Sequence, residues 1–314
     1  MPCPCHLAET GDCILCSQLS GKNFCDCVNW KGVCIYQEYF WNGCKAKDTR
    51  TSYLCRIISK ENVEENVIIL TLLAKHKLVQ DLNCPGGFIF MRNPKSDQFF
   101  DAPISIMEAD IEENTLTLAI ELKGVKTKNI DKLQEDDNVL IRGPYWNGVL
   151  GLKNVTSTKD STAILVARGI GQAPMIPVMK KLYSQGNKII AIIDKGSYKN
   201  LFINDYLEMC NAITHEINML NGGDLSEEFI KFLTGLTDSE KPEIIHCAGP
   251  DILISKVMNF VKPGIKFSCC NNAKMCCGEG VCGTCSVRYK GHKVKKLCKV
   301  QIDPEYIFKD RRFL

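Results

Sequence analysis

The sequence lacks a long apolar run, a strong excess of charge of either sign, and any repeat or low-complexity tract. No uninterrupted apolar run approaches the roughly 18–20 residues that a membrane-spanning helix needs, which excludes a membrane span. The formal net charge of the 314 residues is +3, and a chain so near neutrality is not typical of a nucleic-acid-binding protein. Because 45% of the residues are apolar, disorder throughout the chain is excluded as well.

Signals of secretion and of side-chain catalysis are also missing. The first residues contain neither a basic stretch nor an apolar one, so we expect no signal peptide and a soluble, cytoplasmic protein. No Ser/His/Asp arrangement and no acid–base pair of side chains is apparent, so we assign no catalytic residue.

What the sequence does contain is 19 cysteines, gathered near its two ends. Nine lie within residues 3–55 and seven within residues 269–298. A disulfide-stapled protein is normally short and secreted, and an odd number of cysteines fits pairing poorly. We therefore interpret the two groups as metal sites that flank a globular middle.

The middle of the chain predicts a β-barrel followed by an α/β layer. Short apolar runs separated by turns predict barrel strands at residues 67–73, 87–91, 115–122 and 138–142. Strands then alternate with helices, with strands expected at 163–167, 188–194 and 243–247 and helices at 173–182, 202–212, 226–234 and 251–261. We expect Asp224 and Glu227 to cap the helix at 226–234. The alternation predicts a parallel sheet with ligands at the carboxyl ends of its strands.

The C-terminal cysteines have the spacing of a [2Fe–2S] site. Counted from Cys277, the pattern is C-x4-C-x2-C-x12-C, which makes Cys282, Cys285 and Cys298 the other ligands. Plant-type clusters use C-x4-C-x2-C with a distant fourth cysteine, and neighbouring glycines let backbone N–H groups turn toward the sulfurs. A structural zinc site is the alternative, although C-x4-C is an irregular zinc spacing.

A glycine-rich turn at residues 168–174 connects a predicted strand to a predicted helix. Its sequence, Arg-Gly-Ile-Gly-Gln-Ala-Pro, would place free N–H groups and a helix N-terminus at a phosphate. A second turn, Cys-Ala-Gly-Pro at 247–250, ends a later strand and would give the nicotinamide half of a dinucleotide a flat backbone to lie against. Together, the two turns predict a dinucleotide site.

Read in order, six motifs resemble those of the ferredoxin–NADP reductase superfamily: residues 103–105, 124–127, 143–148, 169–174 and 247–250 and the C-terminal cysteines. Within it, the chain resembles the iron–sulfur electron-transfer subunit of dihydroorotate dehydrogenase, its relative in sulfide dehydrogenase, and the small subunit of NADH-dependent ferredoxin:NADP oxidoreductase. The resemblance covers residues 51–314. It implies a flavin-binding barrel at 51–155, an NAD(P)-binding α/β domain at 156–264 and a [2Fe–2S] segment at 265–314, after a Cys-rich extension at 1–50.

The resemblance also implies roles for single residues. FAD would contact the strand at Pro103, Ile104 and Ser105, the diphosphate loop at Gly124 and Thr127, and the barrel-closing turn at Gly143 and Pro144. NAD(P)H would contact Gly169, Gly171, Ala173 and Pro174 through its phosphates, and Cys247, Gly249 and Pro250 through its nicotinamide.

Two positions depart from the family pattern. The arginine that usually pairs with the flavin diphosphate is Ala102, and the usual glycine before Gly169 is Arg168. Arg168 could itself meet a flavin or nucleotide phosphate, since bidentate pairing suits arginine, or it could point to solvent, with flavin binding weakened or lost. Asp194 could accept a hydrogen bond from a ribose, which would favour NAD(H), or it could be an ordinary surface residue.

The N-terminal cysteines have no counterpart in the family pattern. Cys13 and Cys16 form a C-x2-C pair, and Cys25 and Cys27 lie close enough in sequence to complete four thiolates, with Cys34 as a substitute. These ligands are compatible with a second iron–sulfur cluster, with a structural zinc, or with redox-active thiols.

These observations favour an electron-transfer flavoprotein that moves electrons between NAD(P)H, FAD and a [2Fe–2S] cluster. We expect a catalytic oxidoreductase subunit or a ferredoxin-like acceptor as its partner. Residues 261–314 carry a net charge of +8, which fits either an acidic partner or a solvated face. The alternatives are a flavin-depleted iron–sulfur scaffold or redox sensor, favoured by Ala102 and Arg168, and a reductase subunit of a sulfite reductase or hydrogenase.

Overall fold

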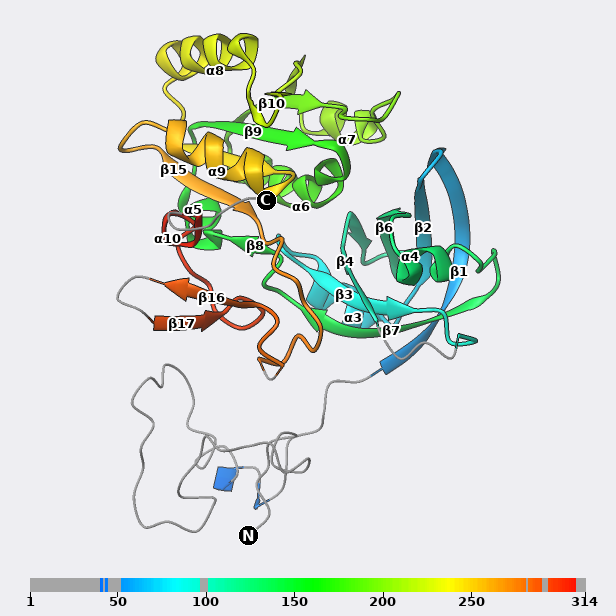
Figure 1. Cartoon of the computed structure of the whole chain (residues 1–314). Helices are drawn as coiled ribbons and strands as arrows, with labels where there is room; N and C mark the ends of the chain where they lie inside the picture. Colours follow the sequence, from blue (N-terminus) through cyan, green and yellow to red (C-terminus); the bar gives the residue numbers. More distant parts are fainter. Residues whose placement is uncertain are drawn as a thin grey trace. The chain divides into compact units, whose positions relative to one another are not determined.

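The computed structural model describes residues 40–41, 43–44, 52–96, 101–280, 282–289 and 293–308. The chain divides into two compact units, Met1–Thr51 and Ser52–Leu314, and the elements described below belong to the second (Figure 1). In this described part of the chain, no helix combines the length and the apolar character needed to cross a membrane.

The first half of the second unit is an antiparallel, barrel-like sheet of seven strands in the order β4-β3-β7-β1-β2-β6-β5 (Figure 1). The strands are β1 (Ser52–Glu64), β2 (Val67–Leu73), β3 (Phe88–Arg92), β4 (Ala102–Ser105), β5 (Glu108–Asp110), β6 (Thr115–Glu121) and β7 (Asn138–Tyr145), with helices α3 (His76–Leu82) and α4 (Val125–Ile130) between them. Alternate side chains, such as Ile68, Leu70 and Leu72 of β2, are fully buried in its core. The predicted barrel is confirmed.

The second sheet has six strands in the order β11-β10-β9-β14-β15-β8. These are β8 (Val149–Leu150), β9 (Thr162–Arg168), β10 (Lys188–Asp194), β11 (Ile213–Glu216), β14 (Ile244–Ala248) and β15 (Lys266–Cys270). Five of them run parallel, but β8 pairs antiparallel with β15. The sheet is therefore mixed rather than purely parallel, because the chain leaving β7 adds a short edge strand before the first helix of the layer.

Helices cover both faces of this second sheet. Ala163 and Leu165 of β9 pack on the side of α6 (Gln172–Ser184), whereas Ile164 and Val166 pack on the side of α8 (Glu227–Glu240) and α9 (Asp251–Phe260). The successive side chains of a strand point to opposite faces, so a strand covered on both faces is apolar throughout. The remaining elements are α5 (Leu152–Ser157), the 3-10 turn η1 (Gly169–Gly171), α7 (Asn204–Met209), and the hairpin of β12 (Leu220–Asn221) and β13 (Asp224–Leu225).

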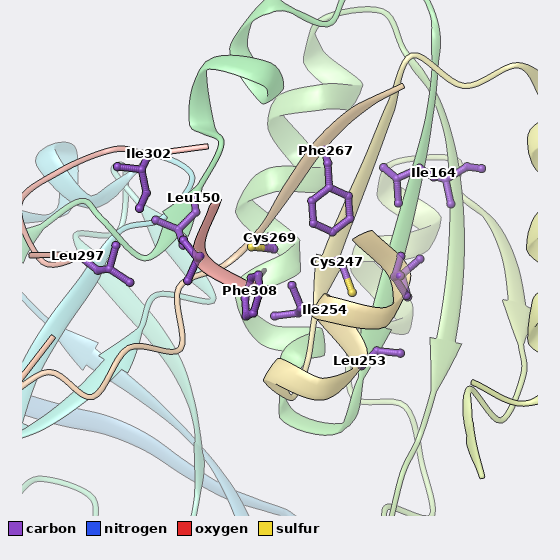
Figure 2. Close-up of a cluster of buried hydrophobic side chains, with 14 of the residues drawn as sticks. Leu150, Ile164, Cys247, Leu253, Ile254, Phe267, Cys269, Leu297, Ile302 and Phe308 are labelled. Carbon is purple, nitrogen blue, oxygen red and sulfur yellow. The ribbon is translucent and has the colours of Figure 1, made fainter. Parts of the chain in front are cut away.

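The C-terminal segment packs against the α9 face of the second sheet. It contains the hairpin of β16 (Ser286–Tyr289) and β17 (Lys293–Lys296) and the short helix α10 (Glu305–Phe308). Leu297, Ile302 and Phe308 are buried in the same apolar core as Ile254 of α9 and Cys269 of β15 (Figure 2).

Most predicted elements are present, with three corrections. The helix predicted at 202–212 is only Asn204–Met209, and the helix predicted at 226–234 continues to Glu240. Its N-cap is Ser226, whose Oγ accepts from the Phe229 N–H at 3.1 Å, whereas Asp224 belongs to β13. The sequence did not predict β1, because only two of its positions are buried and polar residues interrupt its apolar ones.

One buried histidine makes stability depend on pH. His246 of β14 is fully buried, its Nδ1 lies 2.9 Å from Ser268 Oγ, and burial lowers its pKa to about 3. Below pH 6.5 the histidine is protonated in the unfolded chain but stays neutral in the folded one. The free energy of unfolding therefore falls as the pH falls from 6.5 toward 3. Between pH 7 and pH 5 we expect a loss of about 2 kcal/mol from this residue.

Denaturant unfolding at pH 7 and pH 5 measures this loss. The His246→Asn variant, which keeps a polar atom near Ser268, should lack it, while His76→Asn at an exposed position should behave as the wild type. Equal pH dependence in the wild type and in His246→Asn would contradict the assignment.

Candidate functional site

The four cysteines predicted to bind a C-terminal cluster lie together as two pairs. The Sγ atoms of Cys285 and Cys298 are 3.2 Å apart. Cys277 and Cys282 share a hydrogen bond between their side chains, and the thiols of Cys277 and Cys298 interact electrostatically. The structure thus gathers thiols from both ends of the β16–β17 hairpin.

Backbone and side-chain donors surround these sulfurs. The Glu279 N–H donates to Cys277 Sγ at 3.3 Å, and Thr284 Oγ1 donates to Cys282 Sγ at 3.2 Å. The loop turns through three glycines with φ between +71° and +78°, Gly278, Gly280 and Gly283. That backbone region is accessible to glycine without steric cost, and it lets consecutive N–H groups converge on an anion.

Hydrogen-bond donors and burial shift the pKa values of two of these thiols in opposite directions. Burial alone would raise the pKa of Cys282, but hydrogen bonds from Thr284 and Cys277 lower it to about 6. Burial and the neighbouring Cys285 raise the pKa of Cys298 to about 12. A thiol binds a metal as the thiolate, so only a bound cation would ionise Cys298 near neutral pH.

The two pairs of thiols can be compared with the ligand set of a two-iron cluster. A [2Fe–2S] cluster requires two ligands on each of two irons. The pairs Cys277 with Cys282 and Cys285 with Cys298 could supply them.

The barrel presents an outward-facing set of side chains beside this loop. Phe90 pairs with Pro103 on one side and with Arg142 on the other, and Phe88 pairs with Ser105 and Tyr145. Directly paired residues lie on the same face of a sheet, so these six residues form one surface, called the barrel wall below. Ile104, which was also predicted to line a flavin, packs inside the barrel instead.

An irregularity in β7 builds the wall. One residue lies between Phe88 and Phe90 on β3, but two lie between their partners Arg142 and Tyr145 on β7, so β7 carries one extra residue. Gly143 and Pro144 occupy this stretch, and a Cβ on Gly143 would lie 3.0 Å from Ile89. Sequence analysis identified the glycine and the proline but not the two flanking residues.

The expected diphosphate loop has a cation of its own. Ala102 is buried in the barrel core, so β4 offers no positive charge there. Lys126 of α4 reaches the start of this strand, and its Nζ donates to the Asp101 carbonyl at 3.0 Å. Gly124 and Thr127, the two predicted contacts, close the first turn of α4 by mutual hydrogen bonds of 3.3 and 3.2 Å.

The glycine turn lies where the sequence predicts it, between β9 and α6. Gly169 has φ of +56°, and a Cβ on Gly171 would lie 2.4 Å from the Ala248 carbonyl oxygen of β14. Glycine at 171 is therefore needed for the turn to pack against the neighbouring strand. Ala173 is buried and Pro174 occupies the first turn of α6, where a missing N–H costs no helical hydrogen bond.

The Arg168 side chain is 24% exposed and is held by a carboxylate. Its guanidinium pairs with the carboxylate of Asp194, which also accepts from the N–H groups of Gly196 at 2.7 Å and Met219 at 2.8 Å. Asp194 is 6% exposed, so its interpretation as a surface residue is wrong, while its interpretation as a ribose ligand stays a prediction. Desolvation lowers the pKa of Arg168, yet the group stays charged at any ordinary pH.

The other predicted positions are divided between core and surface. The Cys247 side chain is buried in the core of the α/β layer, Gly249 lies against the Cβ of Arg168, and Pro250 is the N-cap of α9. Four further predicted ligands, Cys13, Cys16, Cys25 and Cys27, lie outside the described residues.

No protein-family model matches the chain. It is 28% identical over 246 residues to the electron transfer subunit of dihydroorotate dehydrogenase B (NAD(+)) of Listeria monocytogenes, with 78% of this chain and 92% of that protein covered. The corresponding subunit of Lysinibacillus sphaericus is 28% identical over 254 residues, with 79% and 93% covered.

Solved structures agree on the fold. The structure of an NADH-dependent reduced ferredoxin-NADP oxidoreductase superposes with a TM-score of 0.64 at 20% identity, covering 78% of this chain and 86% of that one. A ferredoxin-NADP+ reductase of Plasmodium falciparum, solved with 2'P-AMP, gives 0.54 at 18% identity, covering 70% and 96%. The chain therefore has the ferredoxin–NADP reductase fold. It is a homologue of the electron transfer subunits of dihydroorotate dehydrogenase B, and the resemblance predicted from its motifs is confirmed.

The glycine turn yields a test of packing that needs no cofactor. Gly171→Ala should lower the free energy of unfolding by about 1–3 kcal/mol, because its methyl group would overlap the Ala248 carbonyl. The control is Gly235→Ala in the middle of α8, where a Cβ meets nothing within 4 Å. Alanine is the better helix former there, so this variant should gain about 0.5–1 kcal/mol. Denaturant titration of both variants would show opposite signs, and equal effects would contradict the packing argument.

Proposed function

We propose that this chain is an electron-transfer subunit that takes electrons from NAD(P)H and passes them through FAD and a [2Fe–2S] cluster to a partner. The observation that carries the proposal is the paired thiol cluster beside the barrel wall of a ferredoxin–NADP reductase fold. When bound, FAD would accept a hydride from the nicotinamide and release electrons singly to the iron–sulfur centre.

The barrel wall supports this path by its dimensions. The outward-facing Pro103 and Ser105 of β4 would meet the flavin, and Arg142 and Tyr145 of β7 contact the thiol loop. One strand, β3, lies between them, so the two positions are about 10 Å apart at two strand spacings. The wall would hold both groups on one rigid sheet, which fixes their separation.

The glycine turn would hold the dinucleotide. Gly169 and Gly171 would expose N–H groups at the N-terminus of α6, where phosphate is favoured by both hydrogen bonds and the helix dipole. Gly249 and Pro250 would lie beside the nicotinamide. Cys247 would pack in the core of the α/β layer at the end of the same strand. We assign flavin to residues 51–155, NAD(P)H to 156–264 and the cluster to 265–314.

The proposed function also requires a protein that accepts the electrons. The relatives are named as electron transfer subunits, so we propose a catalytic oxidoreductase subunit, or a ferredoxin-like protein, as the acceptor.

We propose Cys13, Cys16, Cys25 and Cys27 as ligands of a second iron–sulfur cluster or a zinc ion in residues 1–50. Thiols in this number favour a reducing compartment such as the cytoplasm.

A second function deserves a test because of Ala102 and Arg168. Ala102 brings no charge to the flavin, and the Arg168–Asp194 pair lies at the carboxyl ends of β9 and β10, where the dinucleotide would bind. These two features favour a chain that keeps the cluster but has lost flavin, acting as a scaffold or redox sensor.

Anaerobic purification distinguishes the two functions. Flavin, iron, sulfide and zinc are measured per chain, and the visible spectrum is followed on adding NADH or NADPH. The electron-transfer subunit should hold about one flavin and at least two irons, and either nucleotide should bleach it. Iron without flavin, and no bleaching by either nucleotide, would leave the scaffold or sensor as the function.

Lys126 provides a residue-level test of the flavin site. If its ammonium replaces the missing arginine charge at the diphosphate, Lys126→Met should weaken FAD binding about tenfold, or about 1.4 kcal/mol. The matched control is Lys128→Met, which removes an exposed lysine from the last turn of the same helix. Equilibrium dialysis of FAD against both variants measures the difference, and equal affinities would rule out this role for Lys126.

A further inference from the structure

Arg142 is a barrel residue that touches the loop of the thiol cluster. Its Nη1 donates to the main-chain carbonyl of Cys277 at 3.0 Å, although 135 positions separate the two in sequence. Its Nε and Nη2 donate to one carboxylate oxygen of Asp101 at 3.4 and 3.3 Å. The guanidinium also lies over the rings of Phe90 and Tyr145, 4.7 and 5.5 Å from their centroids.

The loop in turn fits closely against the same two rings. A Cβ on Gly278 would lie 2.5 Å from the Tyr145 ring and 2.8 Å from the Phe90 ring, so only glycine allows this approach. The Tyr145 hydroxyl donates to Glu279 Oε1 at 2.9 Å and accepts from Arg142. The first predicted ligand is thus held on the barrel wall through its own carbonyl and through the two residues that follow it.

We propose that Arg142 is a positioning residue for the [2Fe–2S] centre, holding the Cys277 loop on the barrel wall and raising the reduction potential of the cluster. The inference rests on the proposed function, because it requires a cluster on the four thiolates. It adds a role for a residue of the barrel that supplies no ligand.

The sign of the effect follows from charge. Reduction adds an electron to an already anionic cluster, so a nearby positive charge stabilises the reduced form and raises the potential. The Arg142 side chain is 24% exposed, and a charge this shielded from solvent is screened less than a surface charge. Hydrogen bonding to the Cys277 carbonyl also directs the charge at the ligand itself.

Neighbouring charges modulate this effect without cancelling it. Asp101 is shared between Arg142 and Arg92, whose Nε lies 3.6 Å from its second oxygen, so two guanidinium groups face one carboxylate. Glu279 lies 3.9 Å from Arg142 and 2.7 Å from Lys299. Because Glu279 is an anion beside the first ligand, its neutralisation should move the potential in the opposite direction to loss of Arg142.

The experiment compares four variants of the full-length, anaerobically purified protein with the wild type. Arg142→Gln removes the charge, Arg142→Lys keeps the charge but not the planar fork, and Glu279→Gln neutralises the opposing acid. Arg56→Gln is the matched control, since Arg56 is a barrel arginine paired with Asp136 at 3.5 Å and more than half exposed. Iron per chain and the cluster midpoint potential, from a redox titration followed by visible and EPR spectra, are measured for each.

Arg142→Gln should make one-electron reduction about tenfold less favourable, which corresponds to about 59 mV. Arg142→Lys should recover most of this loss, Glu279→Gln should raise the potential, and Arg56→Gln should leave it unchanged. Loss of iron from Arg142→Gln but not from Arg142→Lys would support the holding role directly. If Arg142→Gln fails to fold, the upward shift in Glu279→Gln still tests the inference.

Three results would each overturn the inference. The first is wild-type iron content and potential in Arg142→Gln. The second is an unmoved potential in Glu279→Gln, and the third is an equal shift in Arg142→Gln and Arg56→Gln. A wild-type protein that binds no iron would instead overturn the proposed function, before any variant is compared.

Discussion

The single extra residue in β7 is the constraint on which the candidate site depends. In a regular strand, residues three apart face opposite sides, so Arg142 and Tyr145 could not share a surface. The shifted register between β3 and β7 places both on the barrel wall. Val139 and Ile141 still point into the barrel core, so the extra residue leaves the apolar interior of the barrel intact. Bulges of this kind re-aim side chains beside functional sites.

The sequence predicted those parts of the fold that depend on local pattern. The strands at 67–73 and 188–194 match β2 and β10 because each consists mainly of branched apolar residues. The long strand β1 escaped prediction, since only two of its thirteen residues are fully buried. Spacing was enough to predict that the four candidate ligands lie together, because C-x4-C-x2-C is a local constraint and the fourth cysteine returns through a short hairpin.

The partners of the charged side chains could not be predicted from the sequence. Arg168 is a departure from the family pattern, and its partner Asp194 ends the neighbouring strand β10, where parallel register sets the two opposite each other. Arg142 precedes the recognised Gly143–Pro144 turn, but its contact with Cys277 joins a barrel strand to the C-terminal segment. Pairing of this type depends on the tertiary fold, and no local periodicity encodes it.

The thiol loop is fixed from two directions, and this makes its position a property of the whole second unit. On one side it meets the barrel wall through Gly278 and Glu279. On the other, Cys285 and Cys298 are buried in the core shared by α9, β15 and α10. A site supported by packed strands and helices keeps its geometry better than one held by a free loop. Since a structure held on both sides reorganises little when charge is added, the same packing that orders the loop suits it to electron transfer.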